Sequence, residues 1–110
     1  MKQYVIDELR LEDFDALKKY LDDQFGPAEM DGIYWIPLAT ELLADIQRQH
    51  DQCGPHLLAL DLDRERIACE LLVRTKTRVR CDCIQYASEQ QRNWLIDLVD
   101  NIFNRLGIAS

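Results

Sequence analysis

From residue 56 onward the apolar residues of this chain recur at every second position, which is the period of a β-strand and not of a helix. One run carries His56, Leu58, Leu60 and Leu62 on a single face. The next run carries Ile67, Cys69, Leu71 and Val73 on a single face. If Leu62 pairs with Ile67 across a four-residue turn, both apolar sets share one side of an antiparallel pair.

A third strand is expected to follow, with Val79, Cys81 and Cys83 on the same apolar face. Pairing of Val73 with Val79 would place Cys69 directly opposite Cys83. A slip of one residue would turn both later cysteines to the other face, so the spacing constrains the parity of this strand.

Three segments have the helical period. Residues 12–25 repeat apolar side chains every three or four positions and end at Gly26-Pro27, and residues 38–50 carry a similar stripe that ends near Gly54. Residues 88–91 match a capping box, with Ser88 as the N-cap, and open an apolar stripe that ends at Gly107. Residues 4–9 and 33–36 have the short apolar pattern of strands.

The elements therefore follow the order β-α-β-α-β-β-β-α. This order predicts an α+β fold with a largely antiparallel sheet and with helices packed on one face. At 110 residues the chain fits one domain over 1–110.

The net charge of −7 comes from 13 Lys and Arg against 20 Asp and Glu, and the bases concentrate within residues 63–80. Phosphate binding requires a dominant positive field, so we expect no nucleic-acid partner. No apolar run is long enough for a membrane span, and we expect no membrane partner. The N-terminus lacks the pattern of a signal peptide, so we expect a cytoplasmic protein.

The cysteines and histidines are the most chemically informative residues of the chain. His50-x-x-Cys53-x-x-His56 and Cys81-x-Cys83 together supply five candidate metal ligands. Thiolate and imidazole are the ligands that zinc prefers. The spacing, however, is not that of two Cys-x-x-Cys knuckles, and a flat Cys-x-Cys strand would not wrap around an ion.

Three other interpretations of these residues stay open. Cys69, Cys81 and Cys83 could be small buried hydrophobic side chains. Cys69 and Cys83 could form a redox pair if the expected register holds. Cys53 could be a nucleophile activated by a histidine, although a helix C-terminus disfavours the thiolate.

The outer face of the predicted sheet mixes apolar and charged residues, and such a face could be covered by a second copy or by another protein. We expect a partner or anion to contact residues of this face and of its basic hairpin tip: Leu72, Arg74, Lys76, Arg78, Arg80, Ile84 and Tyr86. The alternative for the tip is a solvated turn whose charges discourage edge pairing. Likewise, Tyr34 and Trp35 either line a ligand groove or belong to the core.

No catalytic fingerprint is present, since the glycines form neither a phosphate loop nor a dinucleotide motif and Ser88 is accounted for as a cap. The sequence favours a non-catalytic binding module without a cofactor, active as a homodimer through the outer face or with another protein. The first alternative is a thiol-based metal or redox module, and the second is an enzyme with Cys53 as nucleophile.

Overall fold

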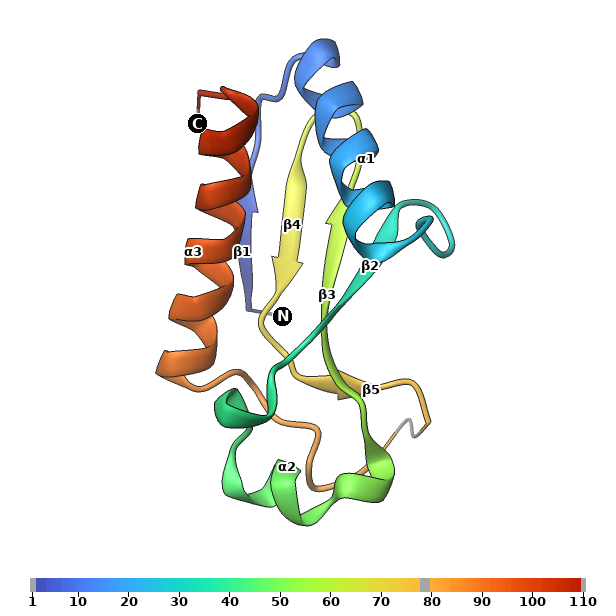
Figure 1. The fold of residues 1–110 in the computed structure, drawn as a ribbon, viewed down its shortest axis with the longest axis vertical. Helices are drawn as coiled ribbons and strands as arrows, with labels where there is room; N and C mark the ends of the chain where they lie inside the picture. The colour runs from blue at the N-terminus through green and yellow to red at the C-terminus, as the bar shows by residue number, and fades with distance from the viewer. Residues whose placement is uncertain (1, 78–79, 110) are drawn as a thin grey trace.

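The computed structural model describes residues 2–77 and 80–109. Its elements in chain order are β1 (Gln3–Ile6), α1 (Leu11–Phe25), β2 (Ile33–Pro37), η1 (Thr40–Leu42), α2 (Asp45–Gln49), η2 (Asp51–Cys53), β3 (His56–Leu62), β4 (Ile67–Glu70), β5 (Arg74–Thr75) and α3 (Glu89–Leu106). The two long helices lie beside the sheet, and α2 lies at the end of the molecule away from the C-terminus (Figure 1).

Within the described residues the sheet has five strands, in the order β1-β4-β3-β2, and β5 pairs with β3. Every pair is antiparallel. The predicted α+β class is therefore confirmed, and the order of strands and α-helices agrees with the expected one, although the last strand, β5, lies at Arg74–Thr75 and not at the residues predicted for it.

One face of the sheet and the two long helices form the core. The register places Leu60 beside both Tyr34 and Cys69, and Leu62 beside Ile67, so apolar side chains from neighbouring strands share one face. Helix α1 packs Leu17 and Leu21 against this face, and α3 packs residues including Leu95, Val99, Ile102 and Phe103. The predicted pairing of Leu62 with Ile67 is confirmed, because only this parity buries both apolar sets.

Helix α3 begins and ends as its sequence predicts. The Ser88 side chain accepts a hydrogen bond from the backbone N–H of Gln91, while the Gln91 side chain accepts one from the Ser88 N–H. At the other end Gly107 adopts a left-handed conformation with φ of 70°. Both ends satisfy backbone groups that the helix itself leaves unpaired.

The predicted third strand is wrong. The N–H of Val73 donates to the carbonyl of Gln85, and Leu72 forms an isolated bridge with Tyr86. Val79 lies outside the described residues, and Cys69 lies opposite Leu60 and Tyr4 instead of Cys83. A turn in which the Ile84 N–H donates to the Cys81 carbonyl replaces the extended conformation.

The predicted continuous helix over 38–50 is also wrong. The N–H of Leu38 donates to the His56 carbonyl and so prolongs the pairing of β2 with β3, while Ala44 is extended at ψ of 160°. The segment therefore folds as three short pieces, which are the 3-10 helix η1, the five-residue α-helix α2 and the 3-10 helix η2. Gly54 has φ of −63°, so it does not act as the left-handed helix cap that its position indicated.

Gly32 allows β2 and β3 to approach closely. Its φ is +99°, and a Cβ atom at this position would lie 2.3 Å from the backbone oxygen of Leu62. Gly26 also has a positive φ, of +81°, but a Cβ there would meet no atom within 4 Å.

We expect Gly32→Ala to lower the free energy of unfolding by about 3 kcal/mol or more, because it adds a backbone clash to the conformational strain. Gly26→Ala is the matched control and should cost only the strain, about 1–3 kcal/mol. Urea unfolding followed by circular dichroism measures both. Equal losses in the two variants would contradict the close approach.

Candidate metal centre

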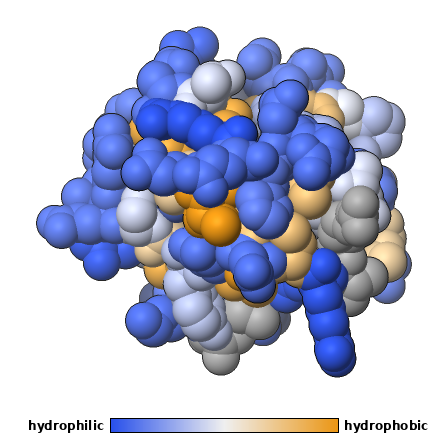
Figure 2. Space-filling model, turned by 90° about the horizontal axis from the view of Figure 1, so that it is seen from below, coloured by the Kyte–Doolittle hydropathy of each residue, from blue (hydrophilic) through white to orange (hydrophobic). Residues whose placement is uncertain are grey.

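Four of the side chains that the sequence singled out converge at the α2 end of the molecule. His50, Cys53, Cys81 and Cys83 each offer one ligand atom, and these atoms all lie within 4.8 Å of one another. Residues almost thirty positions apart in the chain thus form one sulfur- and nitrogen-lined site. Figure 2 views the molecule from below, which is the end at which α2 lies in Figure 1.

The first two candidate ligands come from consecutive helical turns. His50 is the C-cap of α2, and Cys53 is the last residue of η2. The N–H of Cys53 donates to the His50 carbonyl over 2.9 Å, which brings the two side chains to one side of the turn. The Thr77 hydroxyl donates to the Cys53 carbonyl over 2.8 Å and ties this turn to the segment after β5.

The other two candidate ligands come from the turn that replaces the predicted third strand. Because the Ile84 N–H reaches back to the Cys81 carbonyl over 3.0 Å, the chain around Cys81 and Cys83 curves. The expectation that a Cys-x-Cys segment could not wrap around an ion rested on a flat strand, and this turn removes that objection.

The separation of two of the sulfur atoms matches that of tetrahedral coordination, while the imidazole lies at hydrogen-bonding distance from one of them. The Sγ atoms of Cys53 and Cys81 are 3.7 Å apart, and His50 Nδ1 is 3.0 Å from Cys81 Sγ. Two thiolates bound to one tetrahedral zinc at about 2.3 Å lie about 3.8 Å apart. All four cysteines are free thiols.

The site has a buried side and an exposed side. Cys53 and Cys83 are 4% and 0% exposed, whereas His50 and Cys81 are half-buried. The backbone N–H of Cys83 and then its thiol donate to Cys81, and this lowers the pKa of Cys81 to about 7. Burial, followed by the hydrogen bond to Cys81, raises the pKa of Cys83 to about 12. The cluster therefore favours negative charge on the sulfur nearest to solvent.

A buried amide network supports the cysteine turn. The Gln47 side chain donates to the carbonyl of Cys83 over 3.4 Å. Gln91 donates to the Gln47 side chain over 2.9 Å and to the carbonyl of Leu42 over 2.8 Å. Through these contacts the N-terminus of α3 and helix α2 hold the backbone at Cys83.

His56 and Cys69 do not join the cluster. His56 is buried at the start of β3, where burial, reinforced by nearby His50, lowers its pKa. Its Nε2 atom has no hydrogen-bond partner among the described residues. Cys69 lies in the middle of the sheet, where burial raises its pKa to about 12. The predicted pairing of Cys69 with Cys83 is wrong, because it depended on the predicted register and Cys69 lies opposite Tyr4 and Leu60.

The basic segment is largely engaged in ion pairs where the structure describes it. Arg74 pairs with Glu70, and Lys76 pairs with Glu29. Arg80 is exposed, and Arg78 lies outside the described residues.

Among the expected outer-face residues, Leu72 and Ile84 are half-buried, whereas Tyr86 is 50% exposed with the Lys2 ammonium 5.3 Å from its ring centre. The isolated bridge between Leu72 and Tyr86 places them side by side. A dimer through this face stays a prediction.

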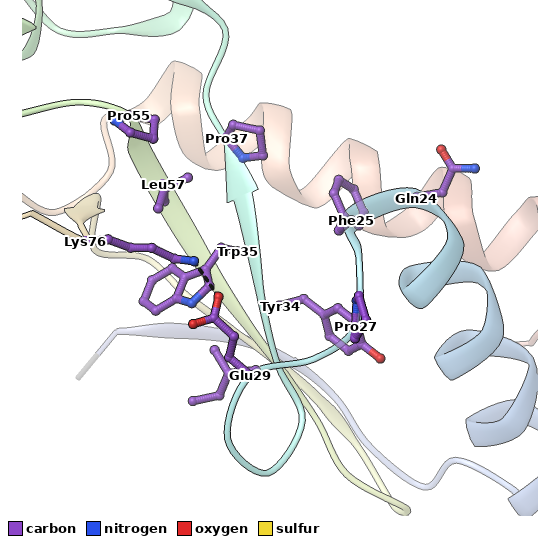
Figure 3. A pocket seen from close by; sticks show the side chains of 11 residues that line it. Gln24, Phe25, Pro27, Glu29, Tyr34, Trp35, Pro37, Pro55, Leu57 and Lys76 are labelled. Carbon is purple, nitrogen blue, oxygen red and sulfur yellow. Dashed lines mark hydrogen bonds and ion pairs between the residues drawn. The ribbon is translucent and has the colours of Figure 1, made fainter.

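The sequence left open whether Tyr34 and Trp35 line a groove or belong to the core, and the two residues differ in this respect. Tyr34 is a core residue whose hydroxyl donates to Asp22 over 2.6 Å. Trp35 lies in a pocket of about 420 Å³, where the Lys76 ammonium is 5.6 Å from its ring centre and also pairs with Glu29 (Figure 3). The pocket therefore has an internal ion pair across the face of its tryptophan.

A scan against models of protein families finds no match for the chain, and searches among curated proteins and among solved structures find none either. Among the described residues, no helix is both long enough and apolar enough to cross a membrane. The candidate site therefore has to be interpreted from its own geometry.

Sequence reasoning missed the two glutamines that support the site. Gln91 was recognised only as part of the capping box, and Gln47 was not singled out. The available signal was their position within otherwise apolar helical stripes, since a buried glutamine needs hydrogen-bond partners.

We expect Gln91→Ala to lower the free energy of unfolding by about 2–4 kcal/mol, because it removes the side-chain acceptor of the Ser88 N–H and leaves Gln47 and the Leu42 carbonyl with fewer partners. The exposed neighbour Gln90 provides the control, and Gln90→Ala should change stability by less than about 0.5 kcal/mol. Chemical denaturation of the two variants checks this. A Gln91→Ala variant as stable as Gln90→Ala would contradict the network.

Proposed function

We propose that the protein is a zinc-binding module in which His50, Cys53, Cys81 and Cys83 hold one structural ion. The observation that carries the proposal is the convergence of one imidazole and three thiols within 4.8 Å. Buried thiols scattered through a core need no metal, but four donor side chains from two distant segments gathered at one point are typical of a metal site.

The donor set favours zinc. Three sulfurs and one nitrogen suit a borderline-soft ion without geometric preference, whereas calcium and magnesium require oxygen ligands. The 3.7 Å separation of the Cys53 and Cys81 sulfurs also agrees with two corners of a zinc tetrahedron.

A structural role is favoured over a catalytic one, because four protein ligands leave no coordination position for water or substrate. The ion would join the turn at Cys81 to the end of α2, in a part of the fold where regular elements are short. Free energy of zinc binding would then contribute to folding of this end.

The proposal narrows the functions predicted from sequence. Cys53 is buried and would serve as a ligand, so we do not propose it as a nucleophile. The module would act by binding other molecules and not by catalysis. Since thiol ligands have to stay reduced, a cytoplasmic location is the one we propose.

Elemental analysis of untagged protein, purified without chelator, should find one zinc per chain. We expect Cys83→Ala to abolish this zinc, because it removes a ligand, whereas Cys69→Ala should retain it. Both cysteines are 0% exposed, so the control loses an equally buried thiol. Cobalt titration adds a spectroscopic measure, since thiolate charge-transfer absorption reports the sulfur ligands.

Zinc absent from the wild-type protein, or retained equally in Cys83→Ala, would overturn the proposal. Because Cys83→Ala could unfold the chain, the half-exposed position provides a second variant. Cys81→Ser should keep the fold, as judged by circular dichroism, and should bind zinc at least tenfold more weakly.

Zinc should also stabilise the fold. At a free zinc concentration one hundred times the dissociation constant, the free energy of unfolding should rise by about 2.7 kcal/mol. This gain should disappear with a chelator and should shrink as the pH falls, because protons compete with zinc for thiolate and imidazole. Thermal unfolding at two pH values, with and without chelator, measures the effect. Equal midpoints with and without zinc would contradict a structural role.

A further inference from the structure

Two of the candidate zinc ligands, Cys53 and Cys81, lie close enough to form a disulfide after a small movement. The sulfurs of Cys53 and Cys81 are 3.7 Å apart, so a movement of about 1.7 Å would bring them to disulfide bonding distance. Neither residue lies within a long helix or a paired strand, because Cys53 ends η2 and Cys81 belongs to a turn.

Access to the pair is from one side. Cys81 is half-buried and contributes to a shallow surface hollow of about 500 Å³, lined by Arg80, Cys81, Asp82 and Ile84. Cys53, Cys69 and Cys83 are all buried. A small oxidant from solvent would therefore meet the Cys81 sulfur first.

We propose that Cys81 is a site of oxidation by hydrogen peroxide and that a Cys53–Cys81 disulfide then releases the zinc ion. The inference rests on the proposed function, since it describes how the zinc site is regulated. It adds an identified pair of sulfurs, an order of reaction and a chemical class of signal.

The step balances as follows in atoms and electrons. The Cys81 thiolate attacks one oxygen of the peroxide, the O–O bond breaks, and a sulfenic acid and a hydroxide form. The Cys53 thiolate then attacks the Cys81 sulfur, the S–O bond breaks and a second hydroxide leaves. The two sulfurs lose two electrons in total, and the peroxide, after protonation, becomes two waters.

Release of the ion follows from the ligand count. A disulfide sulfur is no longer an anionic ligand, so only His50 and Cys83 would remain of the four donors. Two protein ligands do not close a tetrahedral zinc site. The turn at Cys81 would stay attached to η2, now through a covalent bond.

The experiment uses the full, zinc-loaded chain and hydrogen peroxide. A metallochromic indicator follows zinc, and peptide mass spectrometry without reduction identifies the disulfide after the remaining thiols are alkylated. We expect one zinc released per Cys53–Cys81 disulfide, with Cys69 and Cys83 recovered as alkylated thiols. A dithiol reductant should restore zinc binding.

Two variants make the order of reaction testable. Cys69→Ala should behave as the wild type, since this thiol is outside the cluster. Cys53→Ser leaves Cys81 without its partner, so oxidation should stop at a Cys81 sulfenic acid that a dimedone probe captures. Because this variant also weakens the zinc site, it is compared with wild-type protein freed of zinc.

The outcomes separate the two proposals. Zinc that stays bound under peroxide, or leaves with a disulfide between other cysteines, overturns this inference while the zinc site stands. A chain that carries no zinc before oxidation refutes the proposed function and with it zinc release. Peptide mass spectrometry would then still show whether peroxide forms the Cys53–Cys81 disulfide.

Discussion

Strand β3 is the element on which the rest of the structure depends, because it pairs with β2, β4 and β5. Its residues Leu58, Leu60 and Leu62 form the centre of the core face, and the parity of this strand fixes that of its neighbours. Its first two residues, His56 and Leu57, hold β5. The same strand therefore organises the apolar core at one end and positions the chain beside the thiol cluster at the other.

The two ends of the molecule are held by different forces. Helices α1 and α3 cover the sheet with their apolar faces. Each Å² of apolar surface buried in this way stabilises the folded state by about 25 cal/mol. Around α2 the elements are short, and buried polar groups such as Gln47 and Gln91 connect them. Hydrogen bonds between such groups add little net free energy, but their loss is costly. A metal ion at this end would supply stability that the short elements lack.

Local signals in the sequence were sufficient for much of the fold. The capping box at Ser88 and the alternation through Leu62 and Ile67 each depend on neighbouring residues, and both predictions hold. The third strand failed because a spacing of two between Cys81 and Cys83 is compatible with a strand and also with a turn. The candidate metal cluster contains four of the five predicted ligands, but their convergence depends on tertiary contacts between η2 and the Cys81 turn. His56 lies outside the group of converging donor atoms and is buried at the start of β3.

The burial of the thiols would allow the proposed cluster to serve both structure and regulation. Taking a thiolate out of water is unfavourable unless a positive charge compensates it, and burial raises the pKa of Cys83 to about 12, so Cys83 would remain protonated without an ion. Zinc would compensate that charge and hold all three sulfurs as thiolates, which are also the reactive form towards peroxide. The ion would thus stabilise the same species that an oxidant attacks. Exposure would then decide where the attack begins, because Cys81 is half-buried and Cys53 and Cys83 are buried.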